Sequence, residues 1–572
     1  MTDNKFRAQS LEKGAAVLLI STVLVKLIGA FFKIPLSSDV CLGDLGFGYF
    51  SSVYDIFNPF YNLAITGFPV AVSHIIADLV AKNRFSDVNA ALFASRRIFL
   101  RLGIIATFIM LLLIFPFVRL TDKTGQSIYG LFAMLPTVLF CCVASVYRGY
   151  YEGLRNMTYP AVSNIIEALC KLILGFGFAF LTVKFTGNTA FGAAAAMLGI
   201  SIGTVLSALY LHIRFKKQGS DFSQSLNIEP QKYNPDFEKK LAKMLFAFAV
   251  PVAISSLAGS MVAVIDALTV RAQLSVMVRE NYGVLQSMYS SALSDYTAAY
   301  GQVLSKEALP TFLYGIRSKA ITLYNLVPTF TSAIGISAVP FITELFAKND
   351  IIRLKRNVIK TIKLTSFIAF PAGIGLFALS YRIMELLYGA GGSAQAGGKM
   401  LAVYGIAAIF SGLGVVLCCV LQAVKRQNAV LINVLIGMVV KLIANITLTS
   451  VPKLNVHGAV LSTLICYAVI FLLNIISLLK AVGKLSLMKS ALLKPFLAAI
   501  LCGVCAFIIS LISASKIITV IAVSVAVLVY LSALLLLRFF EIEEITEIPF
   551  GKKLLKILKK LKIVNQNSEK MH

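Results

Sequence analysis

Charged residues are scarce in this chain of 572 residues. Asp, Glu, Lys and Arg make up only 14% of it, whereas soluble globular chains carry about 25%. Apolar residues reach 58%, and the mean hydropathy is +0.84. No polar linker long enough to separate soluble domains interrupts the apolar runs. This composition excludes a water-soluble enzyme, and it also excludes disordered, collagen-like and coiled-coil chains.

Acidic residues and catalytic motifs are also in short supply. The chain has 26 Asp and Glu against 53 Lys and Arg, a net charge of +27. A nucleic-acid-binding domain gathers its basic residues on one face, but here they lie between apolar runs, so nucleic acid is not an expected partner. The sequence has no P-loop, no H-E-x-x-H and no G-x-S-x-G. Neither ATP hydrolysis nor a metal site is expected, and the mostly apolar surroundings of the nine cysteines argue against disulfides.

Apolar runs of about twenty residues recur along the chain, which is the length of a helix that spans a membrane core about 30 Å thick. A β-barrel would instead show alternating segments of about ten residues. The runs predict an all-α polytopic membrane protein with about 14 transmembrane helices. The predicted spans are residues 14–32, 50–72, 102–118, 128–147, 161–183, 190–211, 244–270, 320–341, 364–379, 400–424, 429–448, 456–479, 496–514 and 517–537.

The distribution of basic residues predicts the orientation of these spans, because cytoplasmic loops collect Lys and Arg. If the N-terminus is cytoplasmic, 37 basic residues lie on the inner side and 13 on the outer side. An even number of spans then places both termini in the cytoplasm, at the plasma membrane of a bacterium. Residues 550–564 combine a leucine stripe with lysines and predict an amphipathic basic helix on the inner membrane surface. Membrane lipids are therefore expected partners.

Short sequence matches indicate an internal repeat. Residues 78–83 match residues 344–349 at an offset of 266, and a Lys-Leu-Ile run recurs at 171–173 and 441–443. The repeat predicts two pseudo-symmetric six-helix lobes, with two helices appended at the C-terminal end. The predicted N-lobe is 1–215, the cytoplasmic linker 216–243, the C-lobe 244–480 and the final helix pair 496–537. Parallel repeats of this kind build transporters whose substrate site lies between the halves.

Ionisable residues inside the spans are the candidate functional residues, because each costs at least about 2.5 to 3.5 kcal/mol to place there. They are Lys26, Lys171 and Lys441 as cations and Asp55, Glu167 and Asp266 as anions. The three lysines are predicted at mid-depth, where an ammonium is suited to a phosphate oxygen. We expect them to bind a diphosphate group.

The three carboxylates have alternative interpretations. Glu167 and Lys171 have the i,i+4 spacing of an ion pair on one helix face. Asp55 and Asp266 lie nearer the outer side, where they could pair with Lys33 and Arg271. All three could instead tune the charge of the lysines or bind a coupling Na⁺ or H⁺. Apart from such an ion, no cofactor is expected.

Several motifs resemble the polysaccharide biosynthesis family of Gram-positive bacteria, to which stage V sporulation protein B belongs. The residues that carry the resemblance form the runs 45–50, 67–73, 147–163 and 265–268, and the third run includes Arg148, Gly149, Gly153 and Asn156. The family belongs to the multidrug/oligosaccharidyl-lipid/polysaccharide exporter superfamily, which includes lipid II flippases. The resemblance implies two six-helix lobes that move lipid-linked sugars across the membrane. Gram-negative lipid II flippases have prominent cavity arginines, whereas this chain has lysines, which lack the bidentate fork.

The resulting prediction is a monomeric flippase or exporter, not an enzyme. It would move an undecaprenyl-diphosphate-linked saccharide, such as lipid II or a related peptidoglycan or polysaccharide precursor, to the outer leaflet by alternating access. One alternative is a drug/cation antiporter of the same superfamily, which would favour cavity carboxylates over lysines. Another is a membrane glycosyltransferase or ligase, which would need carboxylates in an external loop. The pathway, whether wall growth, sporulation or capsule export, is left open.

Overall fold

The computed structural model describes residues 11–225, 235–485, 488–513 and 515–539, and within these residues every regular element is a helix. Lipid offers no partners for backbone N–H and C=O groups, so the apolar runs must satisfy them within helices. Thirteen of the described helical segments are long and apolar enough to cross a membrane. Each of the fourteen predicted spans lies largely within a helix, although α1, which covers the first, is not among the thirteen. The fold class is confirmed, whereas the count of fourteen stays a prediction.

The chain forms two compact units, and the division interrupts several helices. The first unit comprises Met1–Thr322, Gly391–Ala396 and Val434–Cys466. The second comprises Leu323–Ala390, Gly397–Asn433 and Tyr467–His572. The predicted lobe boundaries, which describe the repeat, stay a prediction. Helices extend into the predicted linker from both sides, while residues 226–234 and the predicted tail helix 550–564 lie outside the described residues.

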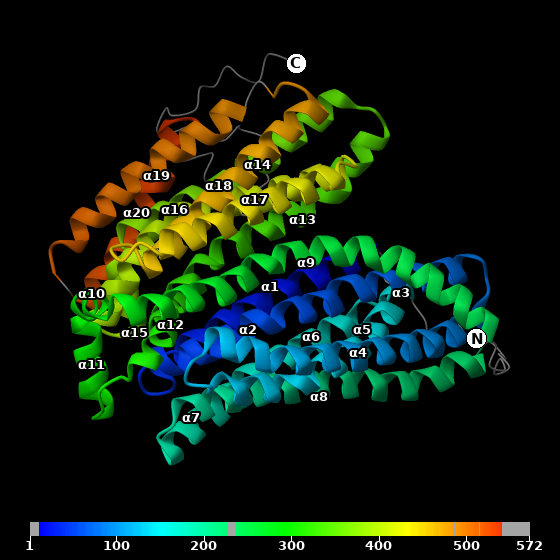
Figure 1. The fold of residues 1–572 in the computed structure, drawn as a ribbon. Coiled ribbons are helices and arrows are strands. Elements are labelled where there is room, and N and C mark those ends of the chain that lie inside the picture. Colours follow the sequence, from blue (N-terminus) through cyan, green and yellow to red (C-terminus); the bar gives the residue numbers. More distant parts are fainter. Residues whose placement is uncertain (1–10, 226–234, 486–487, 514, 540–572) are drawn as a thin grey trace. The chain divides into compact units, whose positions relative to one another are not determined.

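The first unit contains the long helices of the N-terminal half, which run side by side in Figure 1. Its helices are α1 (Leu11–Leu36), α2 (Gly43–Asn62), α3 (Phe68–Ala81), α4 (Phe85–Thr121), α5 (Ser127–Gly153), α6 (Thr158–Cys170), α7 (Phe176–Thr186), α8 (Thr189–Ser225), α9 (Pro235–Glu280), α10 (Tyr282–Met288), α11 (Ser290–Tyr300) and most of α12 (Leu309–Tyr324). The π-helices Leu63–Gly67 and Lys171–Gly175 interrupt two spans, and a 3₁₀ turn, Lys306–Ala308, precedes α12. Such π-segments are frequent at functional sites.

The second unit is built mainly from later helices, of which α14, α19 and α20 pack together. Its helices are α13 (Leu326–Ala347), α14 (Ile351–Ala378), α15 (Ser380–Tyr388), α16 (Gly392–Ala423), α17 (Gln427–Thr449), α18 (Val456–Val482), α19 (Met488–Ser510) and α20 (Lys516–Leu536). Helices α16, α17 and α18 contribute residues to both units.

The backbone repeats with the sequence. Helix α3 ends at Ala81 and α13 at Ala347, an offset of 266, and each is followed by an asparagine with positive φ, Asn83 at 55° and Asn349 at 54°. Each helix has an i,i+4 ion pair at its end. The pair is Lys82–Asp78 at the end of α3 and Lys348–Glu344 at the end of α13. Equivalent turns therefore recur in both halves of the sequence, as the repeat predicts.

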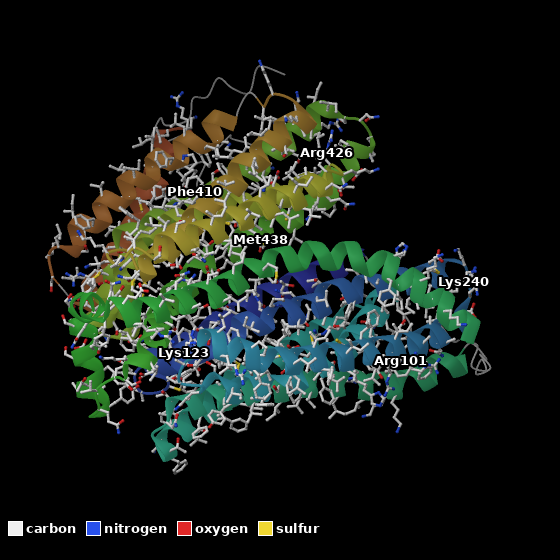
Figure 2. The ribbon with its side chains drawn as sticks, viewed as in Figure 1. Arg101, Lys123, Lys240, Phe410, Arg426 and Met438 are labelled. Carbon is white, nitrogen blue, oxygen red and sulfur yellow. The ribbon has the colours of Figure 1, made fainter. Side chains whose placement is uncertain are left out.

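Charged side chains near the ends of the first unit agree with alternating helix directions. Arg101 of α4 and Lys240 of α9, both predicted to be cytoplasmic, lie toward one end of the bundle in Figure 2. Lys123, predicted to be external, lies toward the other end. The side chains therefore separate toward two ends as alternating helices require, and the assignment of one end to the cytoplasm stays a prediction.

Candidate functional site

Two lysines share one aromatic ring in the first unit, and we call Lys33, Tyr54, Lys171 and Phe32 the Tyr54 cluster. The ammonium of Lys33 lies 4.7 Å from the centroid of the Tyr54 ring, and that of Lys171 lies at the same distance. Lys171 also donates to the Tyr54 hydroxyl at 3.4 Å and lies 5.3 Å from the Phe32 ring. These distances are within the range of cation–π contacts.

The two lysines of this cluster are not neutralised by carboxylates. Within the described residues, no ion pair connects Lys33 or Lys171 to an acidic side chain. Both lysines and Tyr54 are only partly buried. Two cationic groups are therefore held near each other by an uncharged ring, an arrangement that can accept an anion.

Lys33 was considered in the sequence interpretation only as a partner of Asp55, and not as a ligand beside Lys171. It was assigned to the first external loop, but α1 continues through it to Leu36. Lys26, a predicted diphosphate ligand, lies seven residues earlier on the same helix. Seven residues make two helical turns, so Lys26 and Lys33 lie on the same face of α1. Lys26 is also partly buried.

Glu167 pairs with an arginine instead of with Lys171, which corrects the predicted i,i+4 pair. Arg148 Nη2 donates to Glu167 Oε2 at 2.8 Å, and Tyr61 Oη donates to Oε1 at 2.6 Å. Arg148 also donates to Ser163 at 3.0 Å and to Ser207 at 2.9 Å. These contacts join α2, α5, α6 and α8, and both charged groups are buried.

The motif residues around Arg148 shape the helix packing. A Cβ added at Gly149 would lie 2.6 Å from the Pro69 carbonyl oxygen, and one added at Gly153 would lie 2.6 Å from Ile76 Cβ. Both glycines therefore allow α5 to approach α3 closely. Asn156 follows α5, where its backbone N–H donates to Tyr151 at 2.8 Å.

Asp266 is the centre of a second buried group of charges, which we call the Asp266 cluster. Its members are Asp266, Thr269, Arg317, Lys441, Asn445, Ser462 and Thr463. Arg317 and Lys441 both contact Asp266 Oδ2, the latter at 2.8 Å, and Asn445 donates to Oδ1 at 2.8 Å. Lys441 also donates to Thr463 at 2.9 Å.

Lys441 is thus an ion-pair partner in this structure. Its side chain is 0% exposed, and its ammonium donates to the carboxylate of Asp266, which lies 175 residues away in the sequence. The predicted diphosphate contact of Lys441 stays a prediction, because it would require this ion pair to open. Asp55, another predicted site residue, accepts a hydrogen bond of 2.7 Å from Tyr314.

Helix α12 supplies several of these partners, although the sequence interpretation assigned residues 271–319 to an external segment. Tyr314 reaches Asp55, Arg317 reaches Asp266, and Lys319 lies 2.7 Å from Asp44. The eighth span was predicted to begin at residue 320, whereas the apolar segment begins at Lys306. A hydropathy window misses this stretch because its buried cations lower the average.

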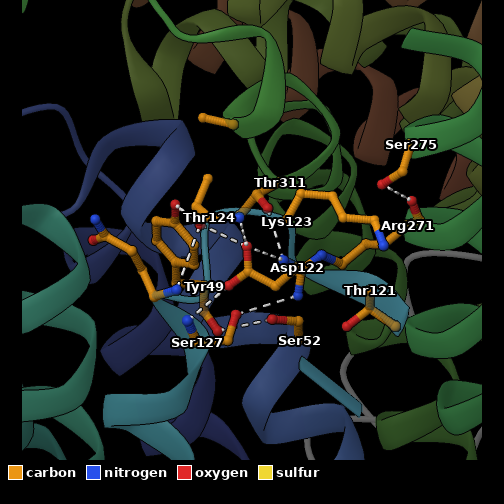
Figure 3. A network of polar contacts seen from close by, with 12 residues as sticks. Tyr49, Ser52, Thr121, Asp122, Lys123, Thr124, Ser127, Arg271, Ser275 and Thr311 are labelled. Atoms are coloured by element: carbon orange, nitrogen blue, oxygen red, sulfur yellow. Dashed lines mark hydrogen bonds and ion pairs between the residues drawn. The ribbon is translucent and has the colours of Figure 1, made fainter. Parts of the chain in front are cut away.

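Arg271 pairs with Asp122 rather than with Asp266, as Figure 3 shows. Asp122 Oδ1 lies 3.4 Å from Arg271 and accepts from the Thr124 hydroxyl, while Oδ2 accepts from the Ser127 N–H. Burial alone would raise the pKa of the Asp122 carboxyl, but Arg271 and these hydrogen bonds outweigh burial and lower that pKa below its ordinary value. The carboxylate between α4 and α5 is therefore held in its charged form. Across the described residues, no group of three or more His, Cys, Asp or Glu is placed to hold a metal ion.

Comparisons with known proteins give a consistent picture. A family model described as Polysaccharide biosynthesis protein matches residues 11–346, and one described as Lipid II flippase MurJ matches residues 322–534. The chain is 25% identical to Lipid II flippase MurJ of Bacillus subtilis (strain 168), with 83% of this chain and 84% of that protein covered. It is also 25% identical to Stage V sporulation protein B of the same organism, with 95% and 98% covered.

Solved structures show the same fold at low sequence identity. An inward closed conformation of Lipid II flippase MurJ matches with a TM-score of 0.62 and 16% identity, covering 90% of this chain and 97% of that one. An inward-facing multidrug resistance MATE family transporter of the MOP superfamily matches with a TM-score of 0.59 and 14% identity, covering 82% and 99%. The matched proteins are flippases and transporters.

Proposed function

Because the chain belongs to the polysaccharide biosynthesis protein family, we propose that it moves a lipid-linked saccharide across the membrane and binds its diphosphate group at Lys33 and Lys171. The relatives named as a lipid II flippase and a sporulation protein support a peptidoglycan or related polysaccharide precursor as the cargo. The saccharide would pass from the inner to the outer leaflet by alternating access.

The observation that carries this proposal is the charge state of the Tyr54 cluster. The two carboxylates near its lysines already have other donors: Asp55 accepts from Tyr314, and Glu167 accepts from Arg148. Lys33 and Lys171 therefore form no ion pair with these carboxylates, and their ammonium groups face the Tyr54 ring. A phosphate oxygen would supply the missing partner through a charge-assisted hydrogen bond. Lys26, two turns from Lys33, is a third candidate ligand.

The rival function, a drug/cation antiporter, would bind a cation at carboxylates. The buried carboxylates described above are instead bonded to cationic or hydroxyl donors, notably Asp266 with Arg317 and Lys441. This argument favours an anionic cargo. We also propose a monomer in a bacterial plasma membrane with both termini cytoplasmic, since basic residues predominate on that side of the predicted topology.

The first prediction concerns the two lysines of the Tyr54 cluster. The purified protein would be reconstituted into vesicles with a fluorescent lipid-linked oligosaccharide, and its transfer between leaflets would be measured. Lys33→Gln and Lys171→Gln should each slow transfer at least about tenfold, because a hydrogen bond to a charged group contributes about 1.5 to 3 kcal/mol.

Lys184→Gln is the matched control, because Lys184 is an exposed lysine at the end of α7, away from this cluster. Its transfer rate should equal that of the wild type. Wild-type rates in both cluster variants would refute the proposed anion site. A change in the sugar bonds of the substrate, instead of in its leaflet, would support a membrane glycosyltransferase.

A further inference from the structure

Tyr54 belongs to a row of aromatic side chains on one face of α2. Phe47, Phe50, Tyr54, Phe57 and Tyr61 follow one another at intervals of three and four residues, the spacing of a single helix face. The Tyr54 ring stacks on Phe50, with centroids 5.9 Å apart and planes inclined by 15°, and it contacts Phe57 at 6.4 Å. The stacked Phe50 ring fixes the plane of the Tyr54 ring, whereas Phe57 makes only a tilted contact with it.

The ring also determines where the two ammonium groups lie. Each is 4.7 Å from the same centroid, so the two nitrogen atoms are separated by less than twice that distance. Phe50 and Phe57 are fully buried, whereas Tyr54 remains partly exposed together with both lysines. Tyr54, which contacts both cations, is therefore one of the two accessible members of the row, and Tyr61 at its end is the other.

An aromatic ring is a different partner for an ammonium than a carboxylate is. A buried carboxylate would form an ion pair with the lysine, as Asp266 does with Lys441. A cation–π contact is weaker than a charge-assisted hydrogen bond to phosphate, so an arriving anion can displace the ring from the amines. The ring thus holds both amines close together without forming an ion pair with either of them.

We propose that Tyr54 is a positioning residue that makes this site prefer a diphosphate group to a single phosphate. The inference rests on the proposed function, since it assumes that Lys33 and Lys171 bind the phosphate part of the cargo. Two ammonium groups held around one rigid ring present two separate sets of donors. A diphosphate can offer one phosphoryl group to each lysine, whereas a monophosphate must divide its oxygens between them.

The test compares two soluble probes, a short-chain prenyl diphosphate and the prenyl monophosphate of the same chain length. Their dissociation constants would be measured by calorimetry on the full-length protein in detergent. The wild type should bind the diphosphate about tenfold more tightly, a difference of about 1.4 kcal/mol. Tyr54→Leu should reduce this ratio to near one, mainly by weakening diphosphate binding. Tyr54→Phe keeps the ring and should retain the ratio.

Phe57→Leu provides the matched control, because Phe57 lies one turn further along the same face and no cation–π contact involves it within the described residues. Its probe ratio should stay at the wild-type value. The inference is overturned if Tyr54→Leu keeps the diphosphate preference, if the wild type shows none, or if Phe57→Leu abolishes it equally. If the wild type binds neither probe, the proposed function itself fails.

The ratio of the two dissociation constants distinguishes a positioning role from a general loss of packing, because a loss of packing would weaken the binding of both probes equally. Recovery in Tyr54→Phe addresses the same point, since phenylalanine restores the ring without the hydroxyl. If Tyr54→Leu is too unstable to measure, the same ratio in Tyr54→Met tests the inference on a flexible side chain that fills irregular space without a ring.

Discussion

Desolvation determines which charge pairs form within the first unit. A buried carboxylate needs several donors to replace the water that it loses, and a lysine one turn away offers only one flexible ammonium. The guanidinium of Arg148 donates to Glu167, Ser163 and Ser207 at once, so it supplies the buried carboxylate with a cation and joins three polar groups. For this reason the arginine, and not Lys171, is the partner of Glu167.

A second prediction at the residue scale follows from this pair. Arg148→Met should destabilise the protein by about 3 to 5 kcal/mol, because it leaves the buried Glu167 without its cation. Denaturant unfolding in detergent would measure the change. The double variant Arg148→Met/Glu167→Gln removes the unpaired charge and should recover part of the loss. A loss below about 1 kcal/mol in the single variant would contradict a structural ion pair.

The identities of the buried charged residues could be predicted from the sequence, but their partners could not. Lys171 and Asp266 are recognisable because ionisable residues in apolar runs are rare. Their partners come from helices that are distant in the sequence, such as Tyr54 for Lys171 and Lys441 for Asp266. Spacing along one helix indicates only local neighbours, so it suggested Lys171 for Glu167 and Arg271 for Asp266. Neither pair is the one that the structure forms.

At the scale of elements, α12 shows that a helix can carry buried cations and still pack tightly. A Cβ at Gly315 would lie 1.8 Å from the carbonyl oxygen of Asp44, and one at Gly48 would lie 2.0 Å from that of Thr311. The backbones of α2 and α12 therefore cross at two glycines. The hydropathy pattern placed the second span at residues 50–72, within the helical segment Gly43–Ala81, and it placed the start of the eighth span at residue 320, because it records average polarity and not burial.

A substitution at this crossing tests the close approach. Gly315→Ala should destabilise the protein by about 1 to 3 kcal/mol, because the added methyl group meets backbone atoms that cannot move independently. Gly177→Ala in α7 is the control, since its Cβ would meet no atom within 4 Å. It should be neutral or stabilising by up to about 1 kcal/mol, because alanine favours helices. Thermal unfolding in detergent would compare them, and equal melting temperatures would contradict the crossing.

At the scale of the whole molecule, the two halves of the sequence have equivalent backbone turns, but their equivalent charged residues have different partners. Arg155 at φ 57° and Lys425 at φ 59° follow α5 and α16 at an offset of 270. The aligned lysines Lys171 and Lys441 keep the same offset, yet one contacts an aromatic ring and the other an aspartate. The repeat was predictable from short sequence matches. The different environments were not, because each depends on residues outside the repeat motif.

This asymmetry leads to a final prediction about the driving force of transport. Asp266 already has two cationic partners and Asp55 has a hydroxyl donor, so a coupling Na⁺ would have to compete with them. We therefore expect the membrane potential to drive the anionic cargo outward, by about 2.3 kcal/mol for each charge and 100 mV. In vesicles with a potassium diffusion potential, negative on the side where labelled lipid starts, transfer should accelerate, and reversing the potential should slow it. A Na⁺ gradient imposed at zero potential should have no effect. Acceleration by the Na⁺ gradient alone would show instead that a carboxylate opens to bind the ion during the transport cycle.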